Sequence, residues 1–196
     1  MQKRKNKTGF FFIVIIFVVI VIVAIIAGID AAKQLEYEHK LAMHPKKYSE
    51  YVEKYAAEYE IDEDIIYAVI KTESDFDSNA VSGVGARGLM QIMGETFDWI
   101  KFRLDDEETV YDDMFDPEMN IRYGAYLVDY LLEKFGDKDT AIAAYHAGAG
   151  CVDGWLEDKA NSADGKRLDN IPSNTTAHYV NKINSALTNY KELYTE

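Results

Sequence analysis

The sequence predicts a mainly α-helical domain that follows one N-terminal transmembrane helix. Three observations support this fold class. An uncharged apolar run occupies residues 9–29, apolar residues beyond it recur at spacings of three and four, and no convincing alternation of polar and apolar residues indicates a strand. Spacings of three and four bring side chains to one face of a helix, so the later stripes are typical of amphipathic helices packed around a core.

The apolar run of residues 9–29 is the expected membrane anchor. Its sequence, GFFFIVIIFVVIVIVAIIAGI, contains neither a charge nor a proline. At about 1.5 Å per residue a helix of this length spans roughly 30 Å, the thickness of a hydrocarbon core. A cleaved signal peptide is the main alternative, but its apolar stretch is usually about 7–15 residues and a small-x-small cleavage site should follow it. A buried core helix should have a polar face, and this run has none. We therefore expect an uncleaved anchor.

Charged residues around the apolar run set the expected topology. The tail of residues 1–8 contains four basic residues and no acidic one, namely Lys3, Arg4, Lys5 and Lys7. By the positive-inside rule this tail stays in the cytoplasm and the rest of the chain is extracellular or periplasmic. Residues 30–44 are charged and weakly amphipathic, and we expect them to form a stalk. Residues 45–196 then form the outer domain.

The part of the chain beyond the anchor is strongly acidic. Four of the 21 basic residues precede the anchor and none of the 34 acidic residues does, so residues 30–196 contain 17 basic and 34 acidic side chains. Nucleic acids repel such a domain, and we expect no nucleic-acid partner. Cys151 is the only cysteine, so no intrachain disulfide can form, and we expect Cys151 to be a small packed residue. The histidines show no ligand spacing, and no metal or cofactor is implied.

Two helices are expected before the first long loop. The first begins after Lys46 and has an apolar stripe made of Tyr48, Val52, Tyr55 and Tyr59. The second is capped by Asp62, and its stripe consists of Ile65, Ile66, Val69 and Ile70. Glycine and serine then cluster in residues 74–88, which indicates a loop.

Three more helices are expected after that loop. One opens at Asp116-Pro117, with proline at the first helical position, and ends at Gly136. Its apolar stripe is Ile121, Gly124, Val128, Leu131 and Phe135. A short alanine-rich helix should begin at Asp139 and end near Ala147. The last helix has the stripe Tyr179, Ile183, Leu187 and Tyr190.

Glu73 is the carboxyl group that the spacing singles out. It follows Ile70 by three residues, Val69 by four and Ile66 by seven, so it projects from the apolar face of its helix. Burial disfavours the charged form and raises the pKa, and the negative end of the helix dipole acts in the same direction. A carboxyl group that stays protonated near neutral pH is what a general acid requires. The alternative is a helix that ends at Thr72 and leaves Glu73 turned into water.

Four segments, in this order, resemble the soluble lytic transglycosylase family. They are Glu73-Ser74, AVSGVGARGLMQIM at residues 80–93, AYHAG at residues 144–148 and IPSNTTAHYV at residues 171–180. One such segment alone would be weak, whereas four with compatible spacing are specific. The resemblance covers roughly residues 48–190. It implies a lysozyme-like α-helical fold, of the goose-type lysozyme kind, and an enzyme that cleaves the glycan strands of peptidoglycan without a cofactor.

The resemblance also implies a catalytic role for Glu73. The carboxyl group would protonate the oxygen of the β-1,4 bond between N-acetylmuramic acid and N-acetylglucosamine, while the substrate's N-acetyl group stabilises C1. As a carboxylate it would then take the proton of the muramic acid C6 hydroxyl, whose oxygen closes onto C1 and forms a 1,6-anhydro sugar. One carboxyl group thus acts as acid and then as base, whereas most glycosidases use two. Asp75 and Asp77 are expected to be solvated in the following loop.

Substrate-binding roles follow from the resemblance for six residues, Ser82, Gln91, Met93, Tyr145, His146 and Tyr179. Ser82 can hydrogen-bond Glu73 or the substrate N-acetyl group, and an ordinary loop serine is its alternative. The rings of Tyr145 and Tyr179 suit sugar contact and their hydroxyls can reach Glu73. For Tyr179 the alternative is core packing.

The QIM segment and the glycines before it have matching chemistry. Gln91 offers a donor and an acceptor to sugar hydroxyls or the acetamide, and Met93 offers an adaptable apolar wall. Gly85 and Gly88 suit a loop whose backbone must approach a neighbour closely.

The chain departs from the family pattern at three places. Gly94 stands where proline is usual, which concerns the start of a helix. His146 replaces a usual asparagine and adds a group that titrates near neutral pH. Thr175, Thr176 and Ala177 stand where a Glu-Thr pair and a nearby arginine are common. This last change removes a second acidic group from the cleft and bears on the rate.

Three functions remain open at this point. The first is a lytic transglycosylase. The second is a hydrolytic muramidase of goose-lysozyme type, which would want another carboxylate to orient water. The third is an inactive wall-binding scaffold, against which the five intact motif residues argue, namely Glu73, Ser82, Gln91, Met93 and Tyr145.

The expected partners are peptidoglycan strands and, through residues 9–29, the membrane. An anchored enzyme would trim glycan in wall growth, or open a passage for an envelope-spanning secretion or conjugation assembly.

Overall fold

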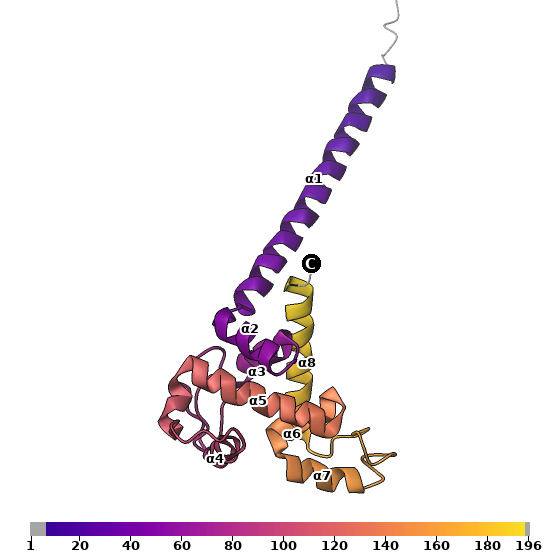
Figure 1. Ribbon diagram of the computed structural model, residues 1–196. Helices are drawn as coiled ribbons and strands as arrows, with labels where there is room; N and C mark the ends of the chain where they lie inside the picture. The colour runs from indigo at the N-terminus through magenta and orange to yellow at the C-terminus, as the bar shows by residue number, and fades with distance from the viewer. Residues whose placement is uncertain (1–6, 195–196) are drawn as a thin grey trace, which may run out of the picture. The chain divides into compact units, whose positions relative to one another are not determined.

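A computed structural model describes residues 7–194, and most of these residues are helical (Figure 1). Their elements are α1 (Lys7–Met43), α2 (Ser49–Glu58), α3 (Glu63–Glu73), α4 (Gly94–Arg103), the 3-10 helix η1 (Tyr111–Phe115), α5 (Pro117–Phe135), α6 (Lys138–Ala147), α7 (Ala149–Glu157) and α8 (Asn174–Tyr194). β-pairing within residues 7–194 is limited to two isolated bridges, Val81 with Arg87 and Arg87 with Ile92. The mainly α fold class is therefore confirmed.

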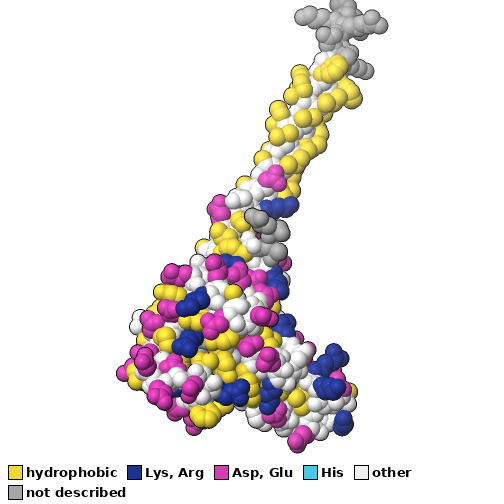
Figure 2. Space-filling model, viewed as in Figure 1, with side chains coloured by type: hydrophobic (Ala, Val, Ile, Leu, Met, Phe, Trp, Pro, Cys, Tyr) yellow, Lys and Arg dark blue, Asp and Glu magenta, His cyan; other side chains and the backbone are white. Residues whose placement is uncertain are grey.

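The chain divides into two compact units between Met43 and His44. The first unit contains α1, which from Gly9 onward is long and apolar enough to cross a membrane, with a mean hydropathy of 3.7 over its apolar window. The apolar side chains of α1 are exposed, as Figure 2 shows. The helix continues through residues 30–43, most of the segment expected to form a stalk. The basic residues 3–5, part of the tail on which the expected orientation rests, lie outside the described residues.

The second unit contains all five helices expected in the outer domain, as α2, α3, α5, α6 and α8. Local caps explain their starts. The Asp62 side chain accepts a hydrogen bond from the amide of Asp64 at the start of α3, and Asp116 does the same for Met119 in α5. The predicted start at Asp139 is wrong by one residue, because Asp137 caps α6 by accepting from the amide of Thr140.

Three elements, α4, η1 and α7, are not among the helices expected from apolar stripes, although the resemblance placed a helix start at Gly94, where α4 begins. They carry weak apolar stripes: α4 buries only Phe97 and Ile100, and α7 only Val152 and Leu156. This arrangement also overturns the expectation for Cys151. The burial of Val152 and Leu156 turns the neighbouring Cys151 away from the core, and its side chain is exposed.

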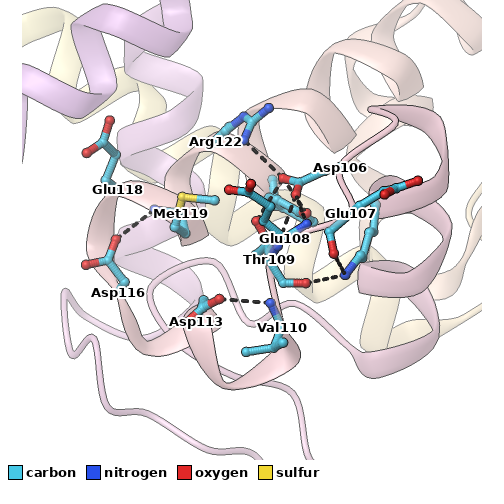
Figure 3. A network of polar contacts seen from close by, with 12 residues as sticks. Asp106, Glu107, Glu108, Thr109, Val110, Asp113, Asp116, Glu118, Met119 and Arg122 are labelled. Atoms are coloured by element: carbon cyan, nitrogen blue, oxygen red, sulfur yellow. Dashed lines mark hydrogen bonds and ion pairs between the residues drawn. The ribbon is translucent and has the colours of Figure 1, made fainter.

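The Asp106 carboxylate connects the loop between α4 and η1 to its surroundings, as Figure 3 shows. Asp106 accepts hydrogen bonds from the Thr109 amide and hydroxyl at 3.0 and 2.8 Å, from the Tyr123 hydroxyl at 3.1 Å and from Arg122 at 3.1 Å. Burial alone would raise the pKa of Asp106, but the hydrogen bonds outweigh it and lower the pKa to about 2. Arg122 and Tyr123 belong to α5, so this carboxylate ties the loop to that helix.

Helix α3 lies at the centre of the second unit, with every residue from Asp64 to Ile70 buried. It packs along α8, while α5 packs against α2 and α6 (Figure 1). The packing of α3 on α8 brings the last residue of α3, Glu73, against the first half of α8.

Candidate active site

Glu73 is the last residue of α3, and its carboxyl group points to α8. Its Oε1 accepts a hydrogen bond from the Tyr179 hydroxyl at 2.6 Å. Burial raises the pKa of Glu73, and the hydrogen bond from Tyr179 opposes that rise only in part. The alternative of a helix that ends at Thr72, with Glu73 turned into water, is wrong for this structure, because α3 includes Glu73.

Two tyrosines stand next to this carboxyl group. Tyr179 is 8% exposed, and burial together with the negative charge of Glu73 raises its pKa well above the usual value. Burial and the same charge also raise the pKa of Tyr145. The Tyr145 hydroxyl, however, donates to the backbone carbonyl of Met90 at 2.7 Å rather than to Glu73. Both hydroxyls therefore keep their protons, and Tyr179 is the one that donates to Glu73.

Two side chains of the loop of residues 80–93 form hydrogen bonds with the backbone of the same loop. The Ser82 hydroxyl accepts hydrogen bonds from the amides of Ala86 at 3.0 Å and Val84 at 3.3 Å. The side-chain amide of Gln91 donates to the carbonyls of Ala80 at 3.1 Å and Gly88 at 2.8 Å. With both amide hydrogens engaged, Gln91 has its side-chain oxygen to offer a ligand.

Met93 and Gly88 mark two further positions of this loop. Met93 is 38% exposed and immediately precedes α4. Gly88 has a φ of +73°, and a Cβ there would lie 2.0 Å from the carbonyl oxygen of Met114. The close approach that the glycine pattern suggested is thus present at Gly88, whereas Gly85, with a φ of +89°, has open space around it.

Asn120 organises the same loop and is absent from the residues that the sequence motifs indicate. Its side chain is fully buried, accepts from the amide of Met90 at 2.7 Å, and donates to the carbonyls of Arg87 at 3.0 Å and Met114 at 2.8 Å. The sequence does contain a pattern that could have indicated Asn120. It precedes Gly124 by four residues and therefore lies on the apolar stripe of α5. A polar residue on an apolar stripe indicates a specific buried partner.

His146 and Thr176, two of the positions that depart from the family pattern, lie together beside Tyr179. The His146 ring lies 4.7 Å from the Tyr179 ring, centroid to centroid, and its Nδ1 is 3.1 Å from the Thr176 hydroxyl. Desolvation of the imidazole lowers its pKa. His146 thus contacts the tyrosine that donates to Glu73.

A cavity of 310 Å³ lies between α4, α5 and α6, and Tyr145 forms part of its lining. The rings of Trp99 and Tyr130 form part of its wall and meet edge to face, 4.7 Å apart. Glu95 also lines this cavity, and it is a carboxyl group that the motifs do not indicate. Aromatic walls with polar groups at the rim suit a sugar ring.

The fold and this site define a lysozyme-like helical domain with a buried carboxyl group at the end of its central helix. The chain belongs to the transglycosylase SLT domain family, whose profile matches residues 50–168. The resemblance drawn from the motifs is therefore confirmed. The soluble lytic murein transglycosylase of Escherichia coli K12 is 31% identical over 150 residues, which cover 75% of this chain and 23% of that protein. The membrane-bound lytic murein transglycosylase C of Yersinia pestis is 30% identical over 167 residues, 74% of this chain and 47% of that protein.

Solved structures agree with this family. The 70-kDa soluble lytic transglycosylase of Escherichia coli matches 81% of this chain with a TM-score of 0.73 and 28% identity, over 26% of its own length. An inactive variant of lytic transglycosylase Slt from Pseudomonas aeruginosa matches 76% of this chain with a TM-score of 0.68 and 30% identity, over 24% of its length. The chain thus spans about a quarter of these soluble relatives.

Proposed function

We propose that the second unit is a peptidoglycan lytic transglycosylase, with Glu73 as its acid and then its base. It cleaves the β-1,4 bond between N-acetylmuramic acid and N-acetylglucosamine and forms 1,6-anhydro-N-acetylmuramic acid. The observation that carries the proposal is the buried Glu73 carboxyl group with its hydrogen bond from Tyr179. The names of the relatives, which are lytic murein transglycosylases, support the same reaction.

The surroundings of Glu73 suit a group that gives up a proton and then takes one back. Burial favours the protonated form, which donates to the glycosidic oxygen. The Tyr179 hydroxyl stabilises the carboxylate that results, and the raised pKa of Tyr179 keeps this donor protonated throughout. The carboxylate then accepts the proton of the C6 hydroxyl, which balances the first transfer. Ser82, Gln91, Met93, Tyr145 and His146 are proposed to hold the sugars on either side.

We further propose that α1 anchors this enzyme in the membrane. Residues 9–29 would span the bilayer, residues 1–8 would lie in the cytoplasm, residues 30–44 would form the stalk, and residues 45–196 would act on the wall outside. The length and apolar composition of α1 and the membrane-bound relative support the anchor. Glycan close to the membrane is then the substrate, either in wall growth or at an envelope-spanning secretion or conjugation assembly.

A hydrolytic muramidase is the second candidate, because Glu95 lines the cavity beside Tyr145 and could orient a water molecule. The products separate the two reactions. Mass spectrometry of digested peptidoglycan should find anhydro ends, each lighter by one water than a reducing end. Reducing ends alone would replace the transglycosylase by the muramidase.

Substitution of the acid tests the mechanism. Glu73→Gln cannot donate or accept the catalytic proton, so the rate should fall by about 10²- to 10⁴-fold. Asp77→Asn is the matched control, since Asp77 is exposed in the loop after α3, and it should digest at the wild-type rate. Digestion by a folded Glu73→Gln variant at the wild-type rate would remove Glu73 from the mechanism.

A further inference from the structure

The imidazole of His146 is exposed and stands next to the partner of the proposed acid. Its ring centroid is 4.7 Å from that of Tyr179, whose hydroxyl donates to Glu73 at 2.6 Å. Partial desolvation lowers the pKa of His146, which favours the neutral ring. A neutral imidazole has one N–H donor and one bare nitrogen that accepts, and its tautomer decides which nitrogen does which.

The Thr176 hydroxyl determines the tautomer of His146. It lies 3.1 Å from Nδ1 of the imidazole and donates its hydrogen to the Ser173 hydroxyl at 3.1 Å. Thr176 is 2% exposed, so water does not compete for this hydroxyl. Because a hydroxyl has one hydrogen, Thr176 cannot also donate to His146 and accepts from it. The proton of the neutral ring is therefore on Nδ1.

Ser173 keeps the Thr176 hydroxyl pointing in this direction. It directly precedes α8, and its oxygen also accepts from the amide of Thr176 at 3.3 Å, as a residue at the start of a helix commonly does. Its own hydrogen is then available for Thr175, whose hydroxyl lies 2.9 Å away. The donors thus run in one direction, from the imidazole along the chain of hydroxyls, and each hydroxyl donates once.

The other ring nitrogen, Nε2, is consequently a bare acceptor. Within residues 7–194 it takes part in no hydrogen bond, and the side chain is exposed. A fixed acceptor suits a group that can only donate, such as an amide N–H. A hydroxyl does not need one, because it can accept from one tautomer and donate to the other. The acetamide N–H of an N-acetylated sugar is such a donor-only group in a glycan strand.

We propose that Thr176, oriented by Ser173, is a positioning residue that holds His146 as the Nδ1–H tautomer, so that Nε2 accepts a hydrogen bond from an acetamide N–H of the glycan. This inference rests on the proposed function, which supplies the N-acetylated strand. A free imidazole side chain favours the opposite tautomer in water. Without the Thr176 hydroxyl the ring would therefore present a donor, which opposes the acetamide N–H.

Nitrogen NMR of the full chain in detergent, with isotope-labelled histidine, tests the tautomer at about pH 8.5, where imidazole is neutral. A nitrogen with a proton and one without have widely separated chemical shifts. Wild-type His146 should have its proton on Nδ1, and Thr176→Val should move it to Nε2. Thr176→Ser keeps the hydroxyl and should retain the wild-type signals. The signals are assigned with His146→Leu, in which they vanish.

The kinetic test measures kcat and KM from the release of anhydro ends by the full chain in detergent. Thr176→Val should raise KM about tenfold and change kcat by less than about twofold, because a contact of the bound glycan is lost. His146→Leu should give a similar rise, and the double variant no further one, since Thr176 acts through His146. The matched control Thr188→Val removes an exposed hydroxyl from the same helix and should leave both constants unchanged.

Three outcomes would overturn this inference. A proton on Nε2 of wild-type His146 excludes the assigned tautomer, and this measurement does not require that Thr176→Val folds. A tautomer that Thr176→Val leaves unchanged removes the positioning role of Thr176. A changed tautomer with an unchanged KM excludes the acetamide, because a hydroxyl binds either tautomer. An absence of anhydro ends would overturn the proposed function instead, and the nitrogen spectra would still decide the tautomer.

Discussion

The side chain of Asn120 should be one of the most sensitive positions in the second unit, and Asn120→Ala tests this. The amide joins three backbone groups of the candidate active-site loop and of η1, at Met90, Arg87 and Met114. Alanine would remove all three hydrogen bonds without adding a group that clashes. The loop that presents the Met90 carbonyl to Tyr145 would lose its connection to α5.

The size of the effect follows from the fate of each partner. The amide of Met90 and the carbonyl of Met114 would be left buried without these bonds, at about 1–3 kcal/mol each. The Arg87 carbonyl keeps a second hydrogen bond, from the amide of Ile92, and adds little. Alanine returns up to about 0.7 kcal/mol through its higher helix propensity. The free energy of unfolding should therefore fall by about 3 kcal/mol, a large share of the roughly 5–15 kcal/mol that stabilises a typical domain.

Urea unfolding in detergent, followed by tryptophan fluorescence, measures this loss. Both tryptophans, Trp99 and Trp155, lie in the His44–Glu196 unit, so the signal reports on that unit. Asn181→Ala is the matched control, because Asn181 is an exposed helical residue of α8 and its replacement should change stability by less than about 0.5 kcal/mol. If Asn120→Ala costs less than about 1 kcal/mol relative to this control, the buried backbone groups have other partners and the reasoning fails.

Three further outcomes are expected. Tyr179→Phe removes the hydrogen bond that favours the Glu73 carboxylate, so the pKa of Glu73 rises further and the alkaline limb of the pH–rate profile, where the acid loses its proton, moves to higher pH; a limb at unchanged pH would contradict this. The pKa of Asp106 is about 2 in the folded chain and about 3.9 when unfolded, so its stabilising effect is present above that range and is lost as the pH falls through it. Asp106→Asn should therefore flatten the pH dependence of the unfolding free energy between about pH 4 and pH 2, and a curve like that of the wild type would refute the assignment. Gly124→Ala would bring a Cβ within 2.2 Å of the Met90 sulfur and 2.9 Å of the Met90 Cβ. This overpacking should lower the free energy of unfolding by about 1–3 kcal/mol in the same urea assay. Wild-type stability would show that Met90 moves freely.

Local pattern was sufficient for the helices with strong apolar stripes. The apolar residues of α3 and its cap at Asp62 could be recognised from the sequence of that segment alone. The structure buries every residue of α3 from Asp64 to Ile70. The same stripe determined that Glu73 projects from an apolar face. Apolar stripes did not predict α4 and α7, because each of these helices buries only two residues, which is too few to form a periodic signal.

Only the tertiary structure shows which residues the side chains of the site contact. Glu73 and Tyr179 are 106 residues apart, and Met90 and Asn120 are 30 apart, so no spacing rule connects them. The sequence motifs indicated Tyr145 as a site residue, but they could not predict that its hydroxyl donates to the Met90 carbonyl. Periodicity within one helix reports which face is buried, because that face repeats every 3.6 residues. Which side chains meet across two helices depends on how those helices pack, and that is decided only when the whole core forms.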